Sequence, residues 1–421
     1  MFRLKSALLL YMLAISTMTG SLAGSAWARP KYKILHAFTG GDDGGGLFGS
    51  LLMDGAGNLY GTTRGGGTHI YGTVFELSPS PHGRWKETVL YNFCTIQSER
   101  SVCGDGALPD GGLVFDRAGN LYGTTSTGGP FNNGEIFELM PGAGGWDLSA
   151  LSDKASLGLV LDRAGNLYGF GGPGYYNGGD VFELSPSPNG WTETVLYSFD
   201  LQNGDGFTPE SALIFDPRGN LYGTTKDGGN WGFGTAFKLR PGPSSTLDLW
   251  QEQILHSFPA FQGDGQYPYA GFVLDQQGNL YGATADGGAA NETCTAGCGT
   301  IFELTPQRHG GWKETILHEF PYLWNGAAPL GTLMFDKAGN MYGTTVSGGK
   351  GQDICTGGCG VVFKMTPGSD GKWKYTVLHR FDGSDGAGPW AALSVDDKGN
   401  VYGTTQYGGS GYYGVVFEIT P

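Results

Sequence analysis

The chain has 421 residues, a formal net charge of −14 and 78 glycines, a glycine share far above the usual roughly 7%. An acidic surface repels phosphate backbones and the sequence contains no basic cluster, so we expect no nucleic acid among its partners. Glycine at this level without a collagen triplet, beside 13% aromatic residues, indicates many tight turns rather than a disordered chain.

The first 28 residues have the pattern of a secretory signal peptide. A basic start precedes an apolar run from residue 7 to residue 15, and Ala26-Trp27-Ala28 offers a small-x-small cleavage site. The run is too short for a spanning helix, and no later stretch is long and apolar enough to cross a bilayer. We therefore expect cleavage near Ala28 and export to the periplasm or the medium. Residues 29–421 should then form one soluble domain.

Ten residues recur seven times along the rest of the chain. The first copy is DGAGNLYGTT at Asp54, and the second is DRAGNLYGTT at Asp116. The copies begin 46 to 62 residues apart, which indicates a repeat architecture. Aspartate at the first position and glycine at the fourth fit a type I turn with a glycine bulge, so each copy should close a hairpin. The asparagines of the copies are Asn58, Asn120, Asn166, Asn220, Asn279, Asn340 and Asn400.

Each repeat contains four short runs with strand character and no helical periodicity. In the second repeat these runs are residues 112–116, 120–125, 134–139 and 146–151. Large apolar residues crowd both faces of the strands, so each small sheet needs a neighbour on both sides. Sheets with this requirement are typical of propeller blades. We predict an all-β, seven-bladed β-propeller of four-stranded antiparallel blades.

The two ends of the chain complement each other. The seventh repeat ends after its third strand, and the N-terminal sequence KYKILHAF matches the outer-strand sequence WKYTVLHRF at residues 373–381. We therefore predict that an N-terminal strand at 32–38 pairs with the C-terminal strand at 414–419 and closes the ring, which removes two exposed sheet edges. An open β-solenoid is the alternative, but it does not predict complementary ends.

The sequence Asp-x-x-Gly-Asn-Leu-Tyr followed by Val-Phe-Glu-Leu resembles the NHL-type propeller repeat. The fuller pattern, GNLYGTT-x2-GG followed by G-x-VFELTP, is more similar to the GloVer tandem-repeat family of exported bacterial proteins, over residues 31–421. The resemblance implies a propeller fold and a location outside the cytoplasm. It implies no reaction, because that family has no established activity and no catalytic residues to carry over.

A connector with the pattern Asp-Gly-x-x-Pro precedes the inner strand of several repeats. Aspartate caps such turns by accepting backbone N–H bonds, which is the simplest interpretation. The alternative is a ring of carboxylates near the channel mouth that holds a cation, although the spacing matches no known calcium loop. We predict no metal and no other cofactor, with this ring as the weaker alternative. Its members are Asp105, Asp205, Asp264 and Asp385.

Aromatic residues occur in the loops between the second and third strands and in the connectors, and the predicted strand order places both on one face. Exposed rings beside Asn, Asp and Gly suit the faces of sugars or a protein hot spot. Alternatively, these rings pack over glycine-rich loops that lack side chains of their own. The predicted ligand site, for a glycan or a protein, includes Phe131, Tyr175, Tyr176, Trp231, Phe233, Trp324, Trp390 and Tyr413.

Six cysteines form three close pairs along the sequence. Two of the pairs are C-x3-C, which would suggest zinc in a cytosolic protein, but an even number in the loops of an exported chain favours disulfides. Each bridge closes a short loop and so stabilises by roughly 2–3 kcal/mol at most, enough to fix a loop but not the ring. The predicted pairs are Cys94–Cys103, Cys294–Cys298 and Cys355–Cys359.

The histidines do not suggest catalysis. Four of them share one outer-strand position with tyrosine, which indicates packing and hydrogen bonding rather than chemistry. We therefore predict a non-catalytic binding or scaffold propeller, a monomer whose loop-rich face takes the ligand. The alternative is a propeller enzyme of the lyase, lactonase or glycosidase type that acts at the mouth of the central channel.

Overall fold

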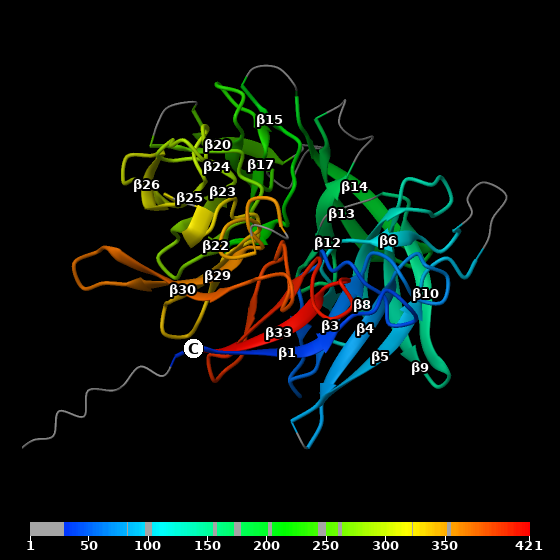
Figure 1. The fold of residues 1–421 in the computed structure, drawn as a ribbon. Helices are drawn as coiled ribbons and strands as arrows, with labels where there is room; N and C mark the ends of the chain where they lie inside the picture. Colours follow the sequence, from blue (N-terminus) through cyan, green and yellow to red (C-terminus); the bar gives the residue numbers. More distant parts are fainter. Residues whose placement is uncertain are drawn as a thin grey trace, which may run out of the picture.

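The computed structural model describes residues 29–81, 83–96, 103–154, 158–171, 178–200, 204–242, 250–259, 263–321, 323–351 and 355–421. Apart from one 3₁₀ turn, η2 (Leu323–Asn325), these residues form strands and loops. The strands make seven four-stranded antiparallel blades arranged as a propeller (Figure 1), as predicted. The expected signal peptide lies outside the described residues. Within the described ranges, no helix has the length and hydropathy needed to cross a bilayer.

The first two strands of each blade form a hairpin around the repeated turn. The first, innermost strands are β2 (Leu52–Met53), β7 (Val114–Phe115), β11 (Val160–Leu161), β16 (Ile214–Phe215), β22 (Val273–Leu274), β27 (Met334–Phe335) and β31 (Ser394–Val395). The second strands are β3 (Leu59–Thr63), β8 (Leu121–Thr127), β12 (Leu167–Gly171), β17 (Leu221–Thr225), β23 (Leu280–Thr284), β28 (Met341–Thr345) and β32 (Val401–Thr405).

The third and fourth strands of each blade form a second hairpin toward the rim. The third strands are β4 (Thr73–Pro79), β9 (Glu135–Gly142), β13 (Asp180–Ser187), β19 (Thr235–Arg240), β25 (Thr300–Pro306), β29 (Val361–Pro367) and β33 (Val415–Thr420). The outer strands are β5 (Trp85–Asn92), β10 (Gly145–Ser152), β14 (Gly190–Ser198), β20 (Gln251–Ser257), β26 (Trp312–Glu319), β30 (Trp373–Arg380) and, from the N-terminus, β1 (Lys31–Ala37).

The connectors add short pairings to this pattern. In blades 1, 2, 4, 5, 6 and 7 the connector pairs with the segment that follows the second strand of its own blade. In blade 2 the connector strand β6 (Ala107–Pro109) joins β8 directly. The separate two-stranded sheets are β15 (Gly206–Phe207) with β18 (Asp227–Gly228), and β21 (Gly265–Gln266) with β24 (Asp286–Gly287).

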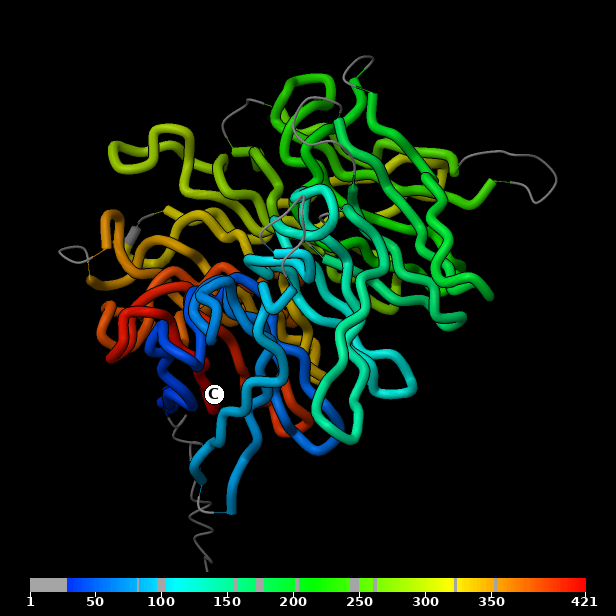
Figure 2. The backbone as a smooth tube through the Cα atoms, turned by 90° about the vertical axis from the view of Figure 1, so that its right-hand side faces the viewer, coloured from blue at the N-terminus to red at the C-terminus, as the bar shows by residue number. Residues whose placement is uncertain are grey.

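The N-terminal and C-terminal strands close the ring. Strand β1 pairs antiparallel with β33, with Lys31 opposite Thr420 and Ala37 opposite Val415, and the backbone N–H of Phe38 donates to the carbonyl of Gly414 (3.0 Å). The first and last segments lie side by side in both views (Figures 1 and 2). The predicted closure is confirmed, and it leaves neither strand as an open edge.

The repeated turn is held by its own aspartate. In blade 2, Asp116 Oδ1 accepts hydrogen bonds from the backbone N–H groups of Ala118 (2.8 Å) and Asn120 (2.9 Å), and Oδ2 accepts from Asn120 Nδ2 (2.9 Å). Gly119 has φ +92°, which a residue with a side chain adopts only under strain. The same aspartate contacts recur in all seven blades, so the turn is satisfied internally.

The tyrosine of the motif packs against the next blade, and the glycine of the motif packs against a phenylalanine of its own blade. Tyr60 of blade 1 meets Phe115 of blade 2 edge to face, with ring centroids 5.0 Å apart. Within a blade, a Cβ on Gly123 would lie 2.5 Å from the ring of Phe137, a side chain that is fully buried. Burying a phenylalanine contributes about 1.5–3 kcal/mol, so the motif stabilises the hydrophobic layers between neighbouring blades.

Candidate functional site

The connectors that lead into blades 1, 2, 4, 5, 6 and 7 are each clamped between two blades. In blade 5, Tyr267 donates its backbone N–H to Phe233 of the preceding hairpin loop (2.9 Å), and its carbonyl accepts from Ala285 of its own blade (3.0 Å). Tyr267 has φ +55°, and Leu108 in blade 2 has the same positive φ of +55°. A non-glycine residue in this region costs about 1–3 kcal/mol, so the clamp fixes the backbone in a strained shape. The clamp therefore also fixes the position of the residue two places after the clamped one, such as Tyr269 in blade 5 and Asp110 in blade 2.

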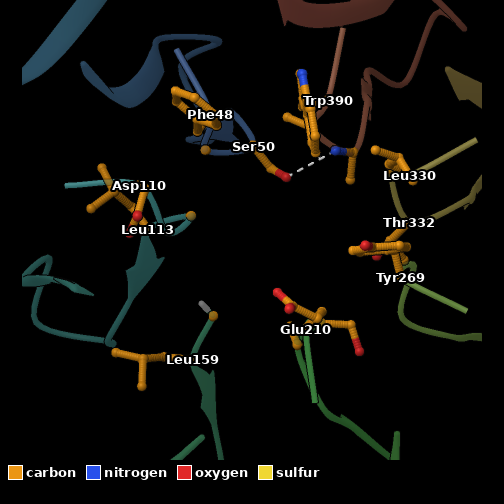
Figure 3. A pocket seen from close by; sticks show the side chains of 18 of the residues that line it. Phe48, Ser50, Asp110, Leu113, Leu159, Glu210, Tyr269, Leu330, Thr332 and Trp390 are labelled. Atoms are coloured by element: carbon orange, nitrogen blue, oxygen red, sulfur yellow. Dashed lines mark hydrogen bonds between the residues drawn. The ribbon is translucent and has the colours of Figure 1, made fainter. Parts of the chain in front are cut away.

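That residue lies at the mouth of the central channel. It stands six positions before the aspartate of each repeated turn, on the side where the connectors enter the inner strands. A cavity of about 260 Å³ opens there, and all seven blades contribute to its lining. Figure 3 shows the labelled side chains arranged around the opening. We call the six described residues at this position the mouth ring: Phe48, Asp110, Glu210, Tyr269, Leu330 and Trp390.

The mouth ring has two chemically different arcs. Because successive blades are neighbours, Tyr269, Leu330, Trp390 and Phe48 form one apolar arc across blades 5, 6, 7 and 1. The rings of Phe48 and Trp390 have centroids 6.2 Å apart, and Trp390 remains 38% exposed. Asp110 of blade 2 and Glu210 of blade 4 make an acidic arc opposite, with Gly158 and Leu159 of blade 3 between them.

Each acid of the mouth ring has a cation nearby. Burial raises the pKa of Asp110 above its ordinary value, and the positive charge of Arg64 opposes this shift. Burial likewise raises the pKa of Glu210, and Lys226 opposes it. The two cations also contact the apolar arc: the Arg64 guanidinium lies 5.1 Å from the centre of the Phe48 ring, and Lys226 Nζ lies 5.0 Å from that of Tyr269. The charge of Asp227 also raises the pKa of Glu210. Each acid of the ring thus has one cation beside it, and the mouth as a whole is polar.

A groove adjoins the mouth between blades 7 and 1. It has a volume of about 460 Å³ and shares Phe48 with the central cavity. Tyr407, Tyr412 and Tyr413 line it, and each of these three rings is at least half exposed. Gln406 Nε2 donates to the hydroxyl of Tyr407 (2.7 Å), which fixes the amide at the edge of the groove. An aromatic track thus runs from Trp390 over Phe48 into the groove.

The predicted aromatic residues are not all gathered at this site. Trp390 lines the central cavity and Tyr413 lines the groove. Phe233 packs against Tyr267, with ring centroids 5.4 Å apart. Phe131, Trp231 and Trp324 are more than half exposed, but they line neither hollow. Tyr175 and Tyr176 lie outside the described residues.

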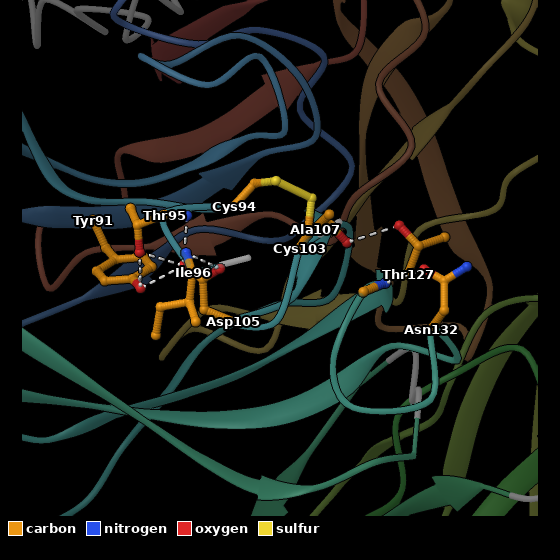
Figure 4. The surroundings of a disulfide bond; sticks show 10 residues. Tyr91, Cys94, Thr95, Ile96, Cys103, Asp105, Ala107, Thr127 and Asn132 are labelled. Carbon is orange, nitrogen blue, oxygen red and sulfur yellow. Dashed lines mark hydrogen bonds between the residues drawn. A yellow bond between two sulfur atoms is a disulfide. The ribbon is translucent and has the colours of Figure 1, made fainter. Parts of the chain in front are cut away.

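The four connector aspartates lie at the seams between outer strands. Asp105 accepts hydrogen bonds from the Tyr91 hydroxyl (2.7 Å) and from the backbone N–H groups of Thr95 and Ile96 (Figure 4). Asp205 accepts from Tyr197, and Asp385 bonds His379. Asp264 lies beside His256. None of the four is among the residues that line the central cavity, so they do not form a common ring at its mouth.

The three predicted disulfides are present. Cys94–Cys103 sits in the connector from blade 1 to blade 2, next to the bonds of Asp105 (Figure 4). Cys294–Cys298 and Cys355–Cys359 lie in equivalent hairpin loops of blades 5 and 6. Disulfides persist in oxidising compartments, and the bridges indicate such an environment for this chain.

The sequence interpretation missed most of the mouth ring. Phe48, Asp110, Glu210 and Leu330 were not predicted as site residues, nor were Arg64 and Lys226 behind them. A signal was present: the mouth position changes identity in every described blade, whereas the turn six residues later is nearly constant. A position that the fold does not constrain is available for recognition.

A solved structure and a family model both match the chain. A crystal structure of a protein from Lactobacillus plantarum matches with a TM-score of 0.43 and 12% identity, over 78% of this chain and 83% of that one. No curated protein matches the sequence. The family model of the Gloeobacter/Verrucomicrobia repeat matches residues 17–153, 105–293 and 288–421, which together span the whole propeller. The chain therefore belongs to the Gloeobacter/Verrucomicrobia repeat family.

Proposed function

We propose that this protein is an exported binding propeller that takes a neutral oligosaccharide at the mouth of its central channel. The observation that carries this proposal is the mouth ring, where one repeat position presents an apolar arc opposite an acidic one. Ligand sites in proteins are concave, with aromatic walls and a few convergent polar groups. The turn six residues later is nearly constant, so the variety of residues at the mouth position supports a ligand site there.

The chemistry of the mouth suits a sugar. The apolar face of a pyranose ring stacks on aromatic side chains such as Trp390, Phe48 and Tyr269. Hydroxyl groups both donate and accept hydrogen bonds, which matches carboxylates with cations beside them. A strongly anionic ligand would meet Asp110 and Glu210, and a strongly cationic one would meet Arg64 and Lys226. A neutral ligand avoids both repulsions.

The two hollows suit a chain rather than a single sugar. The central cavity of about 260 Å³ is smaller than the roughly 300–1,000 Å³ of typical ligand pockets. The groove of about 460 Å³ continues from it past Phe48. A terminal sugar would occupy the mouth, and the following units would lie over Tyr413 and Tyr412.

Binding of defined neutral oligosaccharides tests this function. Tag-free protein is screened on a glycan array, and hits from the cello-, xylo-, chito-, malto- and laminari-oligosaccharide series are titrated calorimetrically. Trp390→Ala and Phe48→Ala should each weaken binding by about tenfold or more. Trp231→Ala is the matched control, because this exposed tryptophan lies outside both hollows and should leave affinity unchanged. An array that responds only to charged glycans, or equal affinity in all three variants, contradicts the proposal.

One observation also favours a glycosidase. Asp110 and Glu210 face the same cavity, and burial raises the pKa of both, as a general acid requires. Incubation of the bound oligosaccharide with the protein, followed by chromatography, separates the two functions. Shorter products that disappear in Glu210→Gln while binding persists would make the propeller an enzyme. Intact oligosaccharide after prolonged incubation supports the binding function.

A further inference from the structure

Neighbouring blades are joined near the rim by a repeated contact of three residues. At several of these seams, a ring at the end of one outer strand, the acid of the following connector and a residue of the next outer strand meet. Between blades 3 and 4, the Tyr197 hydroxyl donates to Asp205 (2.9 Å) and contacts Glu252 (3.1 Å). Between blades 6 and 7, His379 bonds Asp385 (2.8 Å) and stacks on Tyr32. These seams are closed by direct contacts.

The seam between blades 4 and 5 is built differently. His256 Nε2 lies 3.5 Å from Glu314 Oε2 and 3.9 Å from Asp264 Oδ1, separations too long for good hydrogen bonds. One ligand atom from each residue lies within 4.8 Å of the other two. His256 Nε2 and Glu314 Oε1 are buried and have no hydrogen-bond partner, and the Glu314 side chain is only 11% exposed. The equivalent glutamates Glu87 and Glu252 also have one such oxygen, but here the ring nitrogen beside the glutamate has no partner either. Buried polar atoms without partners are rare and need an explanation.

The spacing and the donor types fit a bound metal ion. Two ligands held about 2.1 Å from one tetrahedral ion lie roughly 3.4 Å apart, close to the observed separation of His256 and Glu314. Imidazole nitrogen with two carboxylate oxygens is a donor set for a divalent transition ion, and the two negative charges balance it. We propose that His256, Asp264 and Glu314 form a divalent metal site, best suited to Zn²⁺, that cross-links blades 4 and 5.

The chain supplies its own comparison for this site. The seam between blades 7 and 1 has the same three residue types at the equivalent positions, His36, Asp43 and Glu87. There, His36 Nε2 bonds Asp43 Oδ2 (3.3 Å), and Asp43 also accepts from the backbone N–H of Thr39 (3.0 Å). Within the described ranges, only the seam between blades 4 and 5 brings three such side chains within ligand distance. Geometry, not composition, distinguishes the two seams.

The site is separate from the proposed ligand site. None of its three residues lines the central cavity or the groove. Its ligands come from β20, the following connector and β26, so an ion would tie together two outer strands and the backbone that leads to Tyr269. All six cysteines are in disulfides, so thiolates do not compete for the ion.

Zinc titration of the tag-free mature chain tests the proposal. Protein stripped with EDTA and desalted should bind one equivalent of Zn²⁺ in calorimetry, and added ZnCl₂ should raise its thermal midpoint. His256→Tyr, which copies the residue at position 197, and Glu314→Gln should each weaken binding by at least about 100-fold. His36→Tyr and Glu87→Gln are the matched controls and should bind as the wild type does.

A spectroscopic measurement separates a lost ligand from a misfolded variant. Co²⁺ in the wild-type site should give visible d–d absorption that is missing in His256→Tyr, while near-ultraviolet circular dichroism shows that the variant keeps its tertiary structure. No Zn²⁺ binding by the wild type overturns the proposal. Binding that survives in both seam variants, or that is lost equally in the two controls, overturns it as well.

Discussion

The two ends of the innermost strands behave in opposite ways. At one end, the aspartate of the repeated turn is the same in all seven blades, and Asp116 is satisfied by groups of its own turn. At the other end, the mouth position differs in every described blade and Asp110 faces a cavity. The comparison shows that the residues repeated in every blade are those that build the fold. At the mouth, where seven blades converge, the same repeat position carries a different residue in each described blade.

Two glycines of blade 2 give the largest expected contrast. A Cβ at Gly123, inside the motif, would lie 2.5 Å from Phe137, whereas one at Gly112, beside the mouth, would find its nearest atom at 3.7 Å. Gly123→Ala should therefore lower the free energy of unfolding by about 3 kcal/mol, because the core cannot accommodate the methyl group. Gly112→Ala should change it by less than about 0.5 kcal/mol. Urea unfolding followed by tryptophan fluorescence measures both, and equal losses would erase the contrast.

Two aspartates of the same blade sharpen the comparison. Asp116→Ala removes the acceptor of several hydrogen bonds in the turn and should cost about 2 kcal/mol of unfolding free energy. Asp110→Ala should cost less than about 1 kcal/mol, because the carboxyl is half-buried and faces the cavity. Chemical denaturation at pH 7 is the measurement. A larger loss for Asp110→Ala would mean that the mouth ring is structural.

Glu135 is a place where one blade departs from the repeat inside the fold. The equivalent Thr73 and Thr235 bond the hydroxyls of Thr63 and Thr225 (2.8 Å each), but the Glu135 carboxyl is fully buried without a partner. Burial and the nearby charge of Asp105 raise the pKa of Glu135 from 4.5 to about 8. The protonated carboxyl of Glu135 therefore makes its full contribution to the free energy of unfolding below pH 4.5, and this contribution is lost as the pH rises through about 8.

Glu135→Thr restores the repeat and should remove this pH dependence. The stability of the variant relative to the wild type should rise steadily between pH 5 and pH 8, because over this range the unfolded wild type ionises the carboxyl of Glu135 while the folded wild type keeps it protonated. Unfolding midpoints measured between pH 4.5 and pH 9 provide the test. Parallel pH profiles for the two proteins would show that Glu135 is not the source.

The smallest effect on stability is expected at the aromatic arc. Trp390 is 38% exposed, so Trp390→Phe should change the free energy of unfolding by no more than about 0.5 kcal/mol. The same substitution should still weaken the proposed oligosaccharide by severalfold, because the stacking surface shrinks. Thermal unfolding and calorimetric titration of one preparation compare the two effects directly. A large loss of stability would assign Trp390 to the core.

Much of this architecture could be predicted, and most of the site could not. Local or periodic patterns predicted three features: the turn formed by Asp116 and Gly119, the three cysteine pairs, and the matching strands at the two termini. The mouth ring has no motif of its own. At the seam of blades 4 and 5, the connector pattern named Asp264 as a candidate cation ligand but did not indicate that His256 and Glu314 lie beside it. Trp390 and Tyr413 were found because they are aromatic residues in loops, but the same criterion also selected Phe131, Trp231 and Trp324, which line neither hollow.

The sequence by itself determined the number of blades, the hairpin turns and the ring closure, because each follows from residues that bond within a few positions or repeat at a fixed place. Only the tertiary structure decided which side chains meet. Ser50 and Ala392 are 342 positions apart, yet the backbone N–H of Ala392 in blade 7 donates to the Ser50 hydroxyl of neighbouring blade 1 (3.1 Å, Figure 3). When the ring closes, the residues at one repeat position come to surround the central channel. The chemistry of this site depends on which residues lie next to each other, and no single repeat contains that information.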